Sequence, residues 1–277
     1  MPRGLRRERA VGTPSAGGYL VTVLGEFVLP NGGRVWTAPL IDALGALDIE
    51  EKTARQAIAR SADRGLLTSE KVGRRTRWHL TPHARGVLTE GTKRIYSLHH
   101  EPRPWDGRWL LVFATVPESR RELRYRLRTR LGWAGFAPMA PGAWLSPWVD
   151  REAEVKEVLS ELGLGGEARS FAGAIGGLGD LADLVAEAWD LERIGADYDG
   201  FIERYRRRRP GNERDAFVAS TQLVHDWRRF PFLEPDLPAE LLPRTWSGHR
   251  AADLFHRQHQ RWSPDAWAWW RERAAAD

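Results

Sequence analysis

The spacing of apolar residues predicts a series of helices and one hairpin in the first hundred positions. Between residues 15 and 29 the apolar side chains recur every three or four positions and stop at Pro30, which is typical of an amphipathic helix. Further on, extended residues on both sides of a Gly-Arg-Arg turn indicate a β-hairpin. The expected elements are helices at about 15–29, from Thr37, at about 50–64 and from Thr81 to about 97, an extended piece at 34–36, and the hairpin at 66–80.

Three helices followed by a basic hairpin is the element order of a winged helix-turn-helix. The two threonines that precede helices, Thr37 and Thr81, are each expected to cap the helix that follows. The third helix carries polar residues off its buried face, in the turns that enter the major groove in such domains, where Arg reads guanine and Gln reads adenine. Arginines at the hairpin tip would reach phosphates or the minor groove. The predicted DNA-binding residues are Lys52, Thr53, Arg55, Gln56, Arg60, Arg74, Arg75 and Arg77.

The rest of the chain alternates strands and helices and then becomes helical. A Pro-rich stretch at 99–108 is interpreted as an interdomain linker. Strands are expected at 109–116, 143–146 and 169–175, with helices at 118–133, 151–162 and 180–189; helices at about 191–209, 217–229 and from 249 follow. The β-α-β-α-β order indicates a ferredoxin-like α+β domain. The expected class is α+β with a disordered basic arm (1–14), a winged helix-turn-helix domain (15–98), a linker (99–108), a ferredoxin-like middle domain (109–188) and a helical C-terminal domain (189–277).

Charge is distributed unevenly along the chain. The net charge is +5, but residues 1–100 hold 16 Lys and Arg against 9 Asp and Glu, and the remainder holds 26 against 28. A localised positive field suits a partner with many phosphates, such as double-stranded DNA. The chain has no cysteine, no apolar run long enough to span a bilayer, and no apolar segment typical of a signal peptide after its basic start. A cytoplasmic protein without disulfides or membrane contact is expected.

Several stretches in order also resemble one known family. They are VLGEFVLPNGGRVWTAPLI (23–41), TARQAIARSADRGLL (53–67), VGRRTRWHLTPHARGVL (72–88), WDGRWLLVFATVPE (105–118), GFAPMAPGAWLSP (135–147), AWDL (188–191) and LVHDWRRFPFLEPDLPAELLP (223–243). Together they resemble the phenylacetate-degradation repressors, the PaaX family of winged-helix regulators. The resemblance implies a homodimeric repressor of aromatic-compound catabolism genes, released by an aryl-CoA thioester such as phenylacetyl-CoA. The basic arm before Ser15 departs from the family pattern.

An acyl-CoA effector would need cationic side chains for its phosphates and aromatic walls for its acyl arm. The candidate effector-binding residues are Arg108, Trp109, Arg124, Arg128, Trp144, His225 and Arg228. Each also has an ordinary structural interpretation, because arginines on a helix can line a solvated face and tryptophans can fill a core. The sequence leaves both interpretations open.

No catalytic, metal or cofactor site is predicted. His256 and His259 lie three residues apart on a helix without acidic ligands at a defined spacing and are interpreted as surface histidines. His225 and Asp226 have no Gly-X-Ser-X-Gly elbow nearby and are interpreted as interface or capping residues. Two enzyme classes remain as alternatives, a ferredoxin-like nuclease and an acyl-CoA-processing enzyme. The first strand runs into Ala114-Thr115-Val116, where a nuclease of this type would carry a metal-binding carboxylate.

Overall fold

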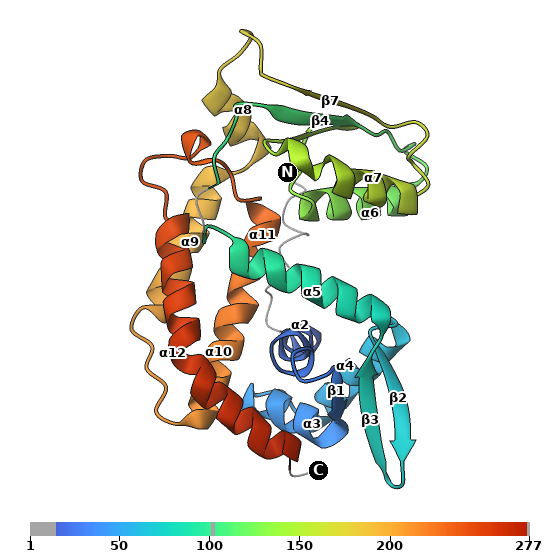
Figure 1. The fold of residues 1–277 in the computed structure, drawn as a ribbon, viewed down its shortest axis with the longest axis vertical. Coiled ribbons are helices and arrows are strands. Elements are labelled where there is room, and N and C mark those ends of the chain that lie inside the picture. The colour runs from blue at the N-terminus through green and yellow to red at the C-terminus, as the bar shows by residue number, and fades with distance from the viewer. Residues whose placement is uncertain (1–14, 101–102, 276–277) are drawn as a thin grey trace. The chain divides into compact units, whose positions relative to one another are not determined.

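The computed structural model describes residues 15–100 and 103–275, so the predicted basic arm lies outside the described residues. The chain forms two compact units (Figure 1). The first unit comprises residues 1–97, 200–229 and 250–277, and the second comprises residues 98–199 and 230–249. This grouping differs from the three consecutive regions expected from the sequence, because the C-terminal helices are shared between the units. Among the described helices, none combines the length and the apolar character that crossing a membrane requires.

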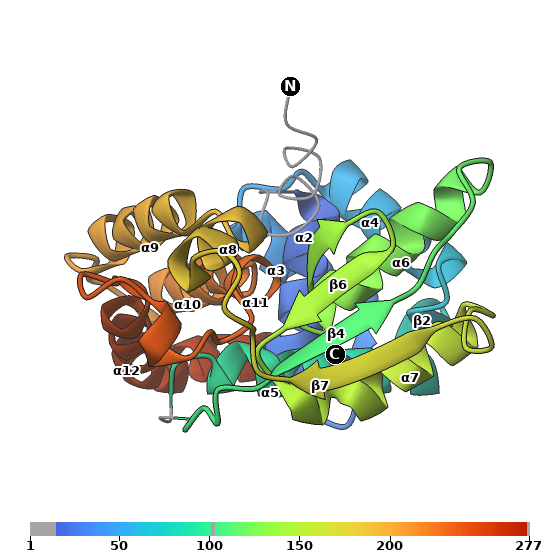
Figure 2. The same cartoon turned by 90° about the horizontal axis from the view of Figure 1, so that it is seen from above.

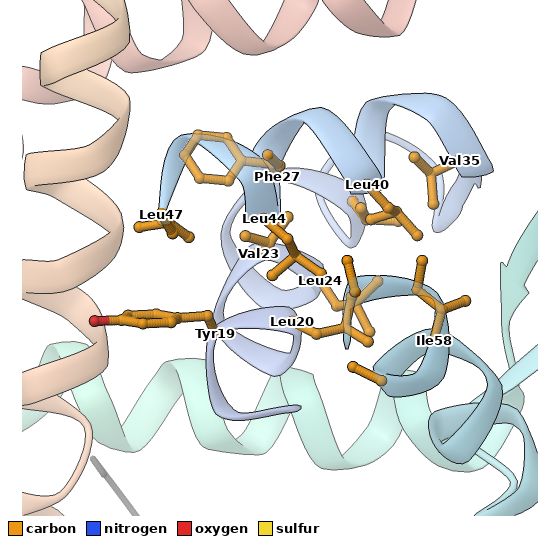
Figure 3. Packing of buried hydrophobic residues seen from close by; sticks show 14 of the residues in the cluster. Tyr19, Leu20, Val23, Leu24, Phe27, Val35, Leu40, Leu44, Leu47 and Ile58 are labelled. Carbon is orange, nitrogen blue, oxygen red and sulfur yellow. The ribbon is translucent and has the colours of Figure 1, made fainter. Parts of the chain in front are cut away.

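The first unit begins with one apolar helix whose last turn widens. Helix α2 (Ala16–Val23) starts at Ser15, whose Oγ accepts a hydrogen bond from the Gly18 amide at 3.0 Å. It continues into a π-helical turn, η1 (Leu24–Val28), closed by a bond from the Leu29 amide to the Leu24 carbonyl at 2.8 Å. The predicted helix at 15–29 is therefore confirmed. Its buried face holds the centre of the core, where Leu20, Leu24 and Phe27 are labelled in Figure 3.

Two further helices pack around α2. Helix α3 (Thr37–Ala46) contributes Leu40 and Leu44, and helix α4 (Glu51–Asp63) contributes Ile58 to the same core (Figure 3). The expected cap by Thr37 is wrong, since Trp36 occupies the cap position and no side chain caps this helix. The Thr37 hydroxyl instead donates to the Thr76 carbonyl and accepts from the Trp78 indole, each at 3.0 Å, because the neighbouring strand offers it partners.

A three-stranded antiparallel sheet completes the winged helix. Strand β1 (Arg34–Trp36) pairs with β3 (Arg75–Leu80), which pairs in turn with β2 (Leu67–Val72). Helix α5 (Pro82–Ser97) follows, and Thr81 caps it as expected, accepting a bond from the Ala84 amide at 3.0 Å. The extended piece, the hairpin and the four helices predicted for the first hundred residues are all present.

Helices from the end of the chain extend the core of the winged helix. These are α10 (Glu213–Trp227) and α12 (Gly248–Ala275), the latter joining this unit from Arg250 onward. The Phe217 ring lies 5.0 Å from that of Phe27 and 4.3 Å from that of Trp269. A domain of about eighty residues buries only a modest core, so these added aromatic rings supply burial that the winged helix lacks by itself.

The second unit contains a ferredoxin-like sheet with two helices on one face (Figure 2). The chain order is β4 (Trp109–Phe113), α6 (Arg121–Trp133), β5 (Ala137–Ala140), β6 (Ala143–Ser146), α7 (Glu152–Glu161) and β7 (Arg169–Gly173). The strands lie in the order β5-β6-β4-β7, and every neighbouring pair is antiparallel. Leu110 and Val112 of β4 are buried with Leu127 and Leu159 of the two helices. Strand β5 was not predicted, because it is four residues long, lies at the sheet edge and contains Pro138.

Shorter elements fill the rest of this unit. They are η2 (Val149–Arg151), α8 (Leu181–Ala188), α11 (Phe230–Leu233) and η3 (Ala239–Leu241), and helix α9 (Leu191–Tyr205) begins here and ends in the first unit. Helix α8 is capped by Asp180, which accepts from two backbone amides. Helix α9 ends four residues before the predicted Arg209. His99, at the start of the predicted linker, has a buried side chain beside Glu234, so this end of the segment is anchored in the second unit.

Candidate nucleic-acid interface

Helix α4 presents one apolar and one polar face. Small and apolar residues, Ala54, Ala57, Ile58 and Ser61, point into the core, and the Ser61 hydroxyl is satisfied by the Ala57 carbonyl at 2.9 Å. The five residues predicted to contact DNA on this helix are all exposed: Lys52, Thr53, Arg55, Gln56 and Arg60. The polar side chains therefore lie on the outer face, where a duplex can approach them.

The β2–β3 hairpin carries the remaining predicted residues. Gly73 adopts a φ of +60° at its tip, a conformation that glycine accepts without strain, and the turn presents Arg74 and Arg75 to solvent. Arg77 differs from them because it is half-buried. Its Nη2 lies 2.9 Å from Glu70, and its guanidinium carbon lies 5.1 Å from the ring centre of Trp36. Arg77 thus helps to hold the hairpin, whereas the two tip arginines are presented outward.

The start of α4 and the hairpin tip border one shallow hollow of about 450 Å³. It brings together three of the eight predicted residues, Arg55, Arg74 and Arg75. Its remaining wall comes from the end of β1, the first turns of α3 and α4, and the start of β3: Trp36, Thr37, Ala38, Ile41, Asp42, Glu51 and Thr76. The sequence did not predict Trp36, Thr37 or Asp42 at this hollow. The hairpin reaches α3 through the pairing of β1 with β3, which joins residues about forty positions apart.

Comparison with protein families identifies all three parts of the chain. Residues 15–84 match a model described as PaaX-like protein, residues 102–185 match the PaaX protein central Cas2-like domain, and residues 189–272 match the PaaX-like protein C-terminal domain. The transcriptional repressor PaaX of Escherichia coli strain K12 is 30% identical over 273 residues, which cover 94% of this chain and 84% of that protein. The chain belongs to the PaaX family.

A solved structure has a similar fold. The uncharacterized protein Rv0674 from Mycobacterium tuberculosis superposes with a TM-score of 0.53 at 21% identity, covering 83% of this chain and 89% of that one. At this identity the likeness concerns the fold alone.

The candidate effector residues of this PaaX-family chain divide between the two units. Arg108, Trp109, Arg124, Arg128 and Trp144 belong to the second unit, whereas His225 and Arg228 belong to the first. Even the two tryptophans do not line one surface. Trp144 pairs with Val112 and joins the core beneath α6 and α7, while Trp109, three residues from Val112, lies on the opposite face beside Trp105 and Trp189.

Both tryptophans nevertheless have unsatisfied polar atoms. The indole Nε1 of Trp109 and that of Trp144 are buried, and neither has a hydrogen-bond partner in the part of the chain that the structure describes. On helix α6, Arg124 donates to the backbone carbonyl of Glu118 at 3.0 Å. Arg108 and Arg128 are exposed. Core packing accounts for the position of Trp144, and none of these arrangements shows a common pocket.

The two candidates at the end of α10 differ in their hydrogen bonding. His225 is fully buried, with its Nδ1 at 3.2 Å from the Thr22 hydroxyl and its ring 4.4 Å from that of Tyr19. Arg228 has a buried Nε without a hydrogen-bond partner among the described residues. Burial removes water from its guanidinium and lowers the pKa of Arg228 to about 10. A buried cation of this kind favours an anionic ligand or partner.

The expectation that His256 and His259 are surface histidines is wrong. The His259 side chain is 24% exposed, and its Nε2 lies 3.1 Å from Glu26 and 2.8 Å from the Tyr96 hydroxyl. Burial, reinforced by the Glu26 carboxylate, raises the pKa of Tyr96, so its hydroxyl stays protonated and donates to Glu26 at 2.7 Å. The Nε2 of His256 is buried as well. These partners come from α5 and η1, far away in sequence, so helix spacing alone could not reveal them.

Proposed function

We propose that this protein binds operator DNA through the outer face of α4 and the tip of the β2–β3 hairpin. The observation that carries the proposal is the convergence of Arg55, Arg74 and Arg75 around one open hollow on the most basic third of the chain. Arginines so placed serve two purposes, since those on a helix in the major groove read base edges and those on a wing hold phosphates. The 30% identity to a transcriptional repressor supports this assignment.

A homodimer would place two copies of α4 in successive major grooves of a pseudo-palindromic operator. In such an arrangement the first two turns of each helix, with Lys52, Thr53, Arg55 and Gln56, face the bases, and Arg60 lies one turn further along. Arg74 and Arg75 neutralise phosphates, and Arg77 keeps the hairpin in position through Glu70 and Trp36. Each contact to a base contributes to specificity, whereas the contacts to phosphate contribute affinity for any sequence.

The second part of the proposal is control by an acyl-CoA thioester, with phenylacetyl-CoA as the first candidate and genes of aromatic-compound catabolism as targets. Arg228 is the best-supported anchor, because its buried Nε has no hydrogen-bond partner among the described residues and a phosphate or carboxylate could supply one. If the effector binds more tightly to a dimer geometry other than the operator-bound one, it lowers the affinity for DNA. The size of this loss is set by the difference between the effector's binding free energies for the two geometries.

One experiment tests both parts with the whole 277-residue chain. A duplex is selected from a random library by repeated binding, and its mobility shift is then measured with phenylacetyl-CoA, acetyl-CoA and free CoA added in turn. We expect the selected duplex to bind at least about a thousandfold more tightly than unrelated DNA at the same salt concentration. We expect phenylacetyl-CoA to release it at concentrations where acetyl-CoA and CoA do not. Equal affinity for selected and unrelated duplexes would contradict operator binding.

The same samples test the two enzymatic alternatives. Cleavage of the duplex in the presence of Mg²⁺ would favour a nuclease, and release of free CoA from the thioester would favour an acyl-CoA-processing enzyme. For a repressor we expect both substrates to be recovered intact after incubation with the protein.

A further inference from the structure

Glu51 and Arg55 form an ion pair on the outer face of α4. The two residues are one helical turn apart, and both Nε and Nη2 of Arg55 contact the same carboxylate oxygen of Glu51, at 2.8 and 2.7 Å. This contact occupies one edge of the planar guanidinium. The terminal fork formed by Nη1 and Nη2 is the edge that can bind the O6 and N7 atoms of guanine with two parallel hydrogen bonds.

Stability of the fold does not explain this pair. The side chains of Arg55 and Glu51 are 59% and 62% exposed, and a surface ion pair one turn apart on a helix contributes little to folding. The carboxylate also places negative charge where phosphates approach, together with Asp42 on the same hollow. An acidic residue at this position lowers affinity for DNA in general, so its contribution must lie elsewhere.

The ion pair with Glu51 restricts the orientations of the Arg55 guanidinium and therefore the groups that it can bind. An unrestrained arginine side chain has many rotamers and can turn to any nearby phosphate, and ordering it at a base costs conformational entropy. An arginine whose Nε edge is already occupied has fewer orientations available. We propose that Glu51 is a positioning residue that holds Arg55 with its terminal fork outward, so that the pair together selects a guanine in the major groove. This inference rests on the proposed DNA-binding function of α4.

A second acidic residue provides a matched control. Glu50 precedes Glu51 at the same end of α4 and is exposed, and within the described ranges it forms no ion pair. Changing either residue to glutamine removes one negative charge from the helix N-terminus, where such charges stabilise the helix. Glu50→Gln therefore reproduces the loss of charge, and only Glu51→Gln also weakens the hold on Arg55.

The test measures base preference as well as affinity. The 277-residue chain and its Glu50→Gln, Glu51→Gln and Arg55→Ala variants are titrated against the selected duplex and against all its single-base variants. We expect the parent to prefer guanine at one position by at least about fivefold, and Arg55→Ala to abolish that preference. Glu51→Gln should lose most of the preference at the same position while binding unrelated DNA as tightly as the parent or more tightly. Glu50→Gln should keep the preference, and circular dichroism should show equal helix content in all four proteins.

The outcomes separate this inference from the function on which it rests. If Glu51→Gln keeps the parental preference while Arg55→Ala loses it, α4 still reads the operator and the role of Glu51 is overturned. If Glu50→Gln and Glu51→Gln lose the preference equally, the effect comes from charge at the helix end, and positioning is again overturned. If Arg55→Ala keeps the full preference, Arg55 does not read that base, and the proposed roles of both Arg55 and Glu51 are overturned.

Discussion

The two units each contain a carboxylate paired with a cation, in opposite surroundings. On α4 of the first unit, Glu51 and Arg55 are more than half exposed. In the second unit, Glu234 and His99 have side chains that are 0% and 2% exposed, with the His99 Nε2 2.5 Å from the carboxylate. Water screens the first pair and is excluded from the second, so the same kind of contact has different consequences.

The buried pair is part of a connected set of bonds. Glu234 also accepts from the Tyr198 hydroxyl at 3.1 Å and from the Leu237 amide, and Asp236 accepts from the His99 amide at 3.2 Å. His99 and Asp236 both adopt positive φ angles, which side-chain-bearing residues rarely do, and these bonds hold them there. The exposed pair leaves the terminal fork of Arg55 open toward solvent, whereas the buried pair fixes the backbone around it.

The largest effect is expected from breaking the buried pair. Glu234→Gln leaves His99 with only the more distant Asp236 carboxylate, 3.3 Å from its Nδ1, and should lower the stability of the second unit by about 3 kcal/mol. Faster amide hydrogen exchange in peptides covering residues 103–113 and 230–237 measures this change. Glu240→Gln, an exposed neighbour in the same unit, should leave the exchange unaltered. Equal protection in the two variants would show that the pair is dispensable.

The same pair should make the second unit less stable as pH rises. Burial alone would lower the pKa of His99, but the Glu234 and Asp236 carboxylates outweigh it and raise that pKa. Burial also raises the pKa of Asp236. The folded state therefore binds protons more tightly, and the stability that His99 contributes is complete below about pH 6.5 and is lost as pH rises through its raised pKa. Amide hydrogen exchange at several pH values, corrected for the intrinsic pH dependence of exchange, measures this decline in stability. In Glu234→Gln the decline with pH should be shallower than in the parent.

Arg228 is an intermediate case: the residue is half-buried, and its buried Nε has no hydrogen-bond partner among the described residues. Arg228→Met should leave the unliganded protein as stable as the parent or more so, since an apolar side chain suits the site better. If Arg228 anchors an acyl-CoA, the variant should lose thermal stabilisation by phenylacetyl-CoA, which for a ligand at a hundred times its Kd amounts to about 2.7 kcal/mol. Arg214→Met, exposed on the same helix, is the control and should retain it. Undiminished stabilisation of Arg228→Met by the thioester would place the anchor elsewhere.

Substitutions on the exposed face of α4 should change the affinity for DNA and not the stability of the fold. Arg55→Ala should weaken binding to the selected duplex by about 1–3 kcal/mol and relax the preference at one base position. Its urea unfolding midpoint should equal that of the parent, because the side chain is exposed. A mobility-shift titration and an unfolding curve measure the two quantities. A variant that binds as tightly as the parent would remove Arg55 from the interface.

The wing tip should contribute less, and without sequence preference. Arg74 is exposed and forms no ion pair in the residues that the structure describes, so on the proposed interface Arg74→Ala should remove one phosphate contact without breaking an ion pair of the protein. Binding should weaken severalfold for every duplex, and the slope of log affinity against log salt should decrease by about 1. Titrations of the selected and an unrelated duplex at four salt concentrations measure this. A loss confined to the selected duplex would mean that Arg74 reads a base.

A feature could be predicted from the sequence when the residues that cause it lie close together along the chain. The winged helix was predictable because apolar spacing, Thr81 as a cap and Gly73 at a turn act within a few residues. The exposed face of α4 was predictable for the same reason. The position of its candidates in one hollow was not, because Arg55 and Arg74 approach each other only through the fold.

Buried polar clusters escaped prediction because their members are far apart along the chain. Glu26, Tyr96 and His259 are joined across 70 to 233 residues, and His99 and Glu234 across 135. His99 begins a Pro-rich stretch that is typical of a linker, and no local pattern distinguishes a histidine that will be buried. The packing of Phe217 and Trp269 against the winged helix was missed for the same reason, since helix periodicity shows that a face is apolar and not which element covers it.

The smallest effect is expected at Glu70, which pairs with Arg77 and His79 on the surface of the hairpin. Those two partners lower the pKa of Glu70, His79 first, so its carboxylate remains ionised throughout the pH range of binding experiments. Because the pair is solvated, Glu70→Gln should leave the urea midpoint unchanged. Arg77 would keep its contact with Trp36, 5.1 Å from the ring centre, and therefore its place in the hairpin. Binding to all duplexes should tighten slightly, because one negative charge is removed near the phosphates, and the salt dependence should become no shallower. Weaker binding by Glu70→Gln would instead mean that Glu70 is needed to hold Arg77 against the hairpin. The hairpin would then depend on its ion pairs as much as the second unit depends on the pair of His99 and Glu234.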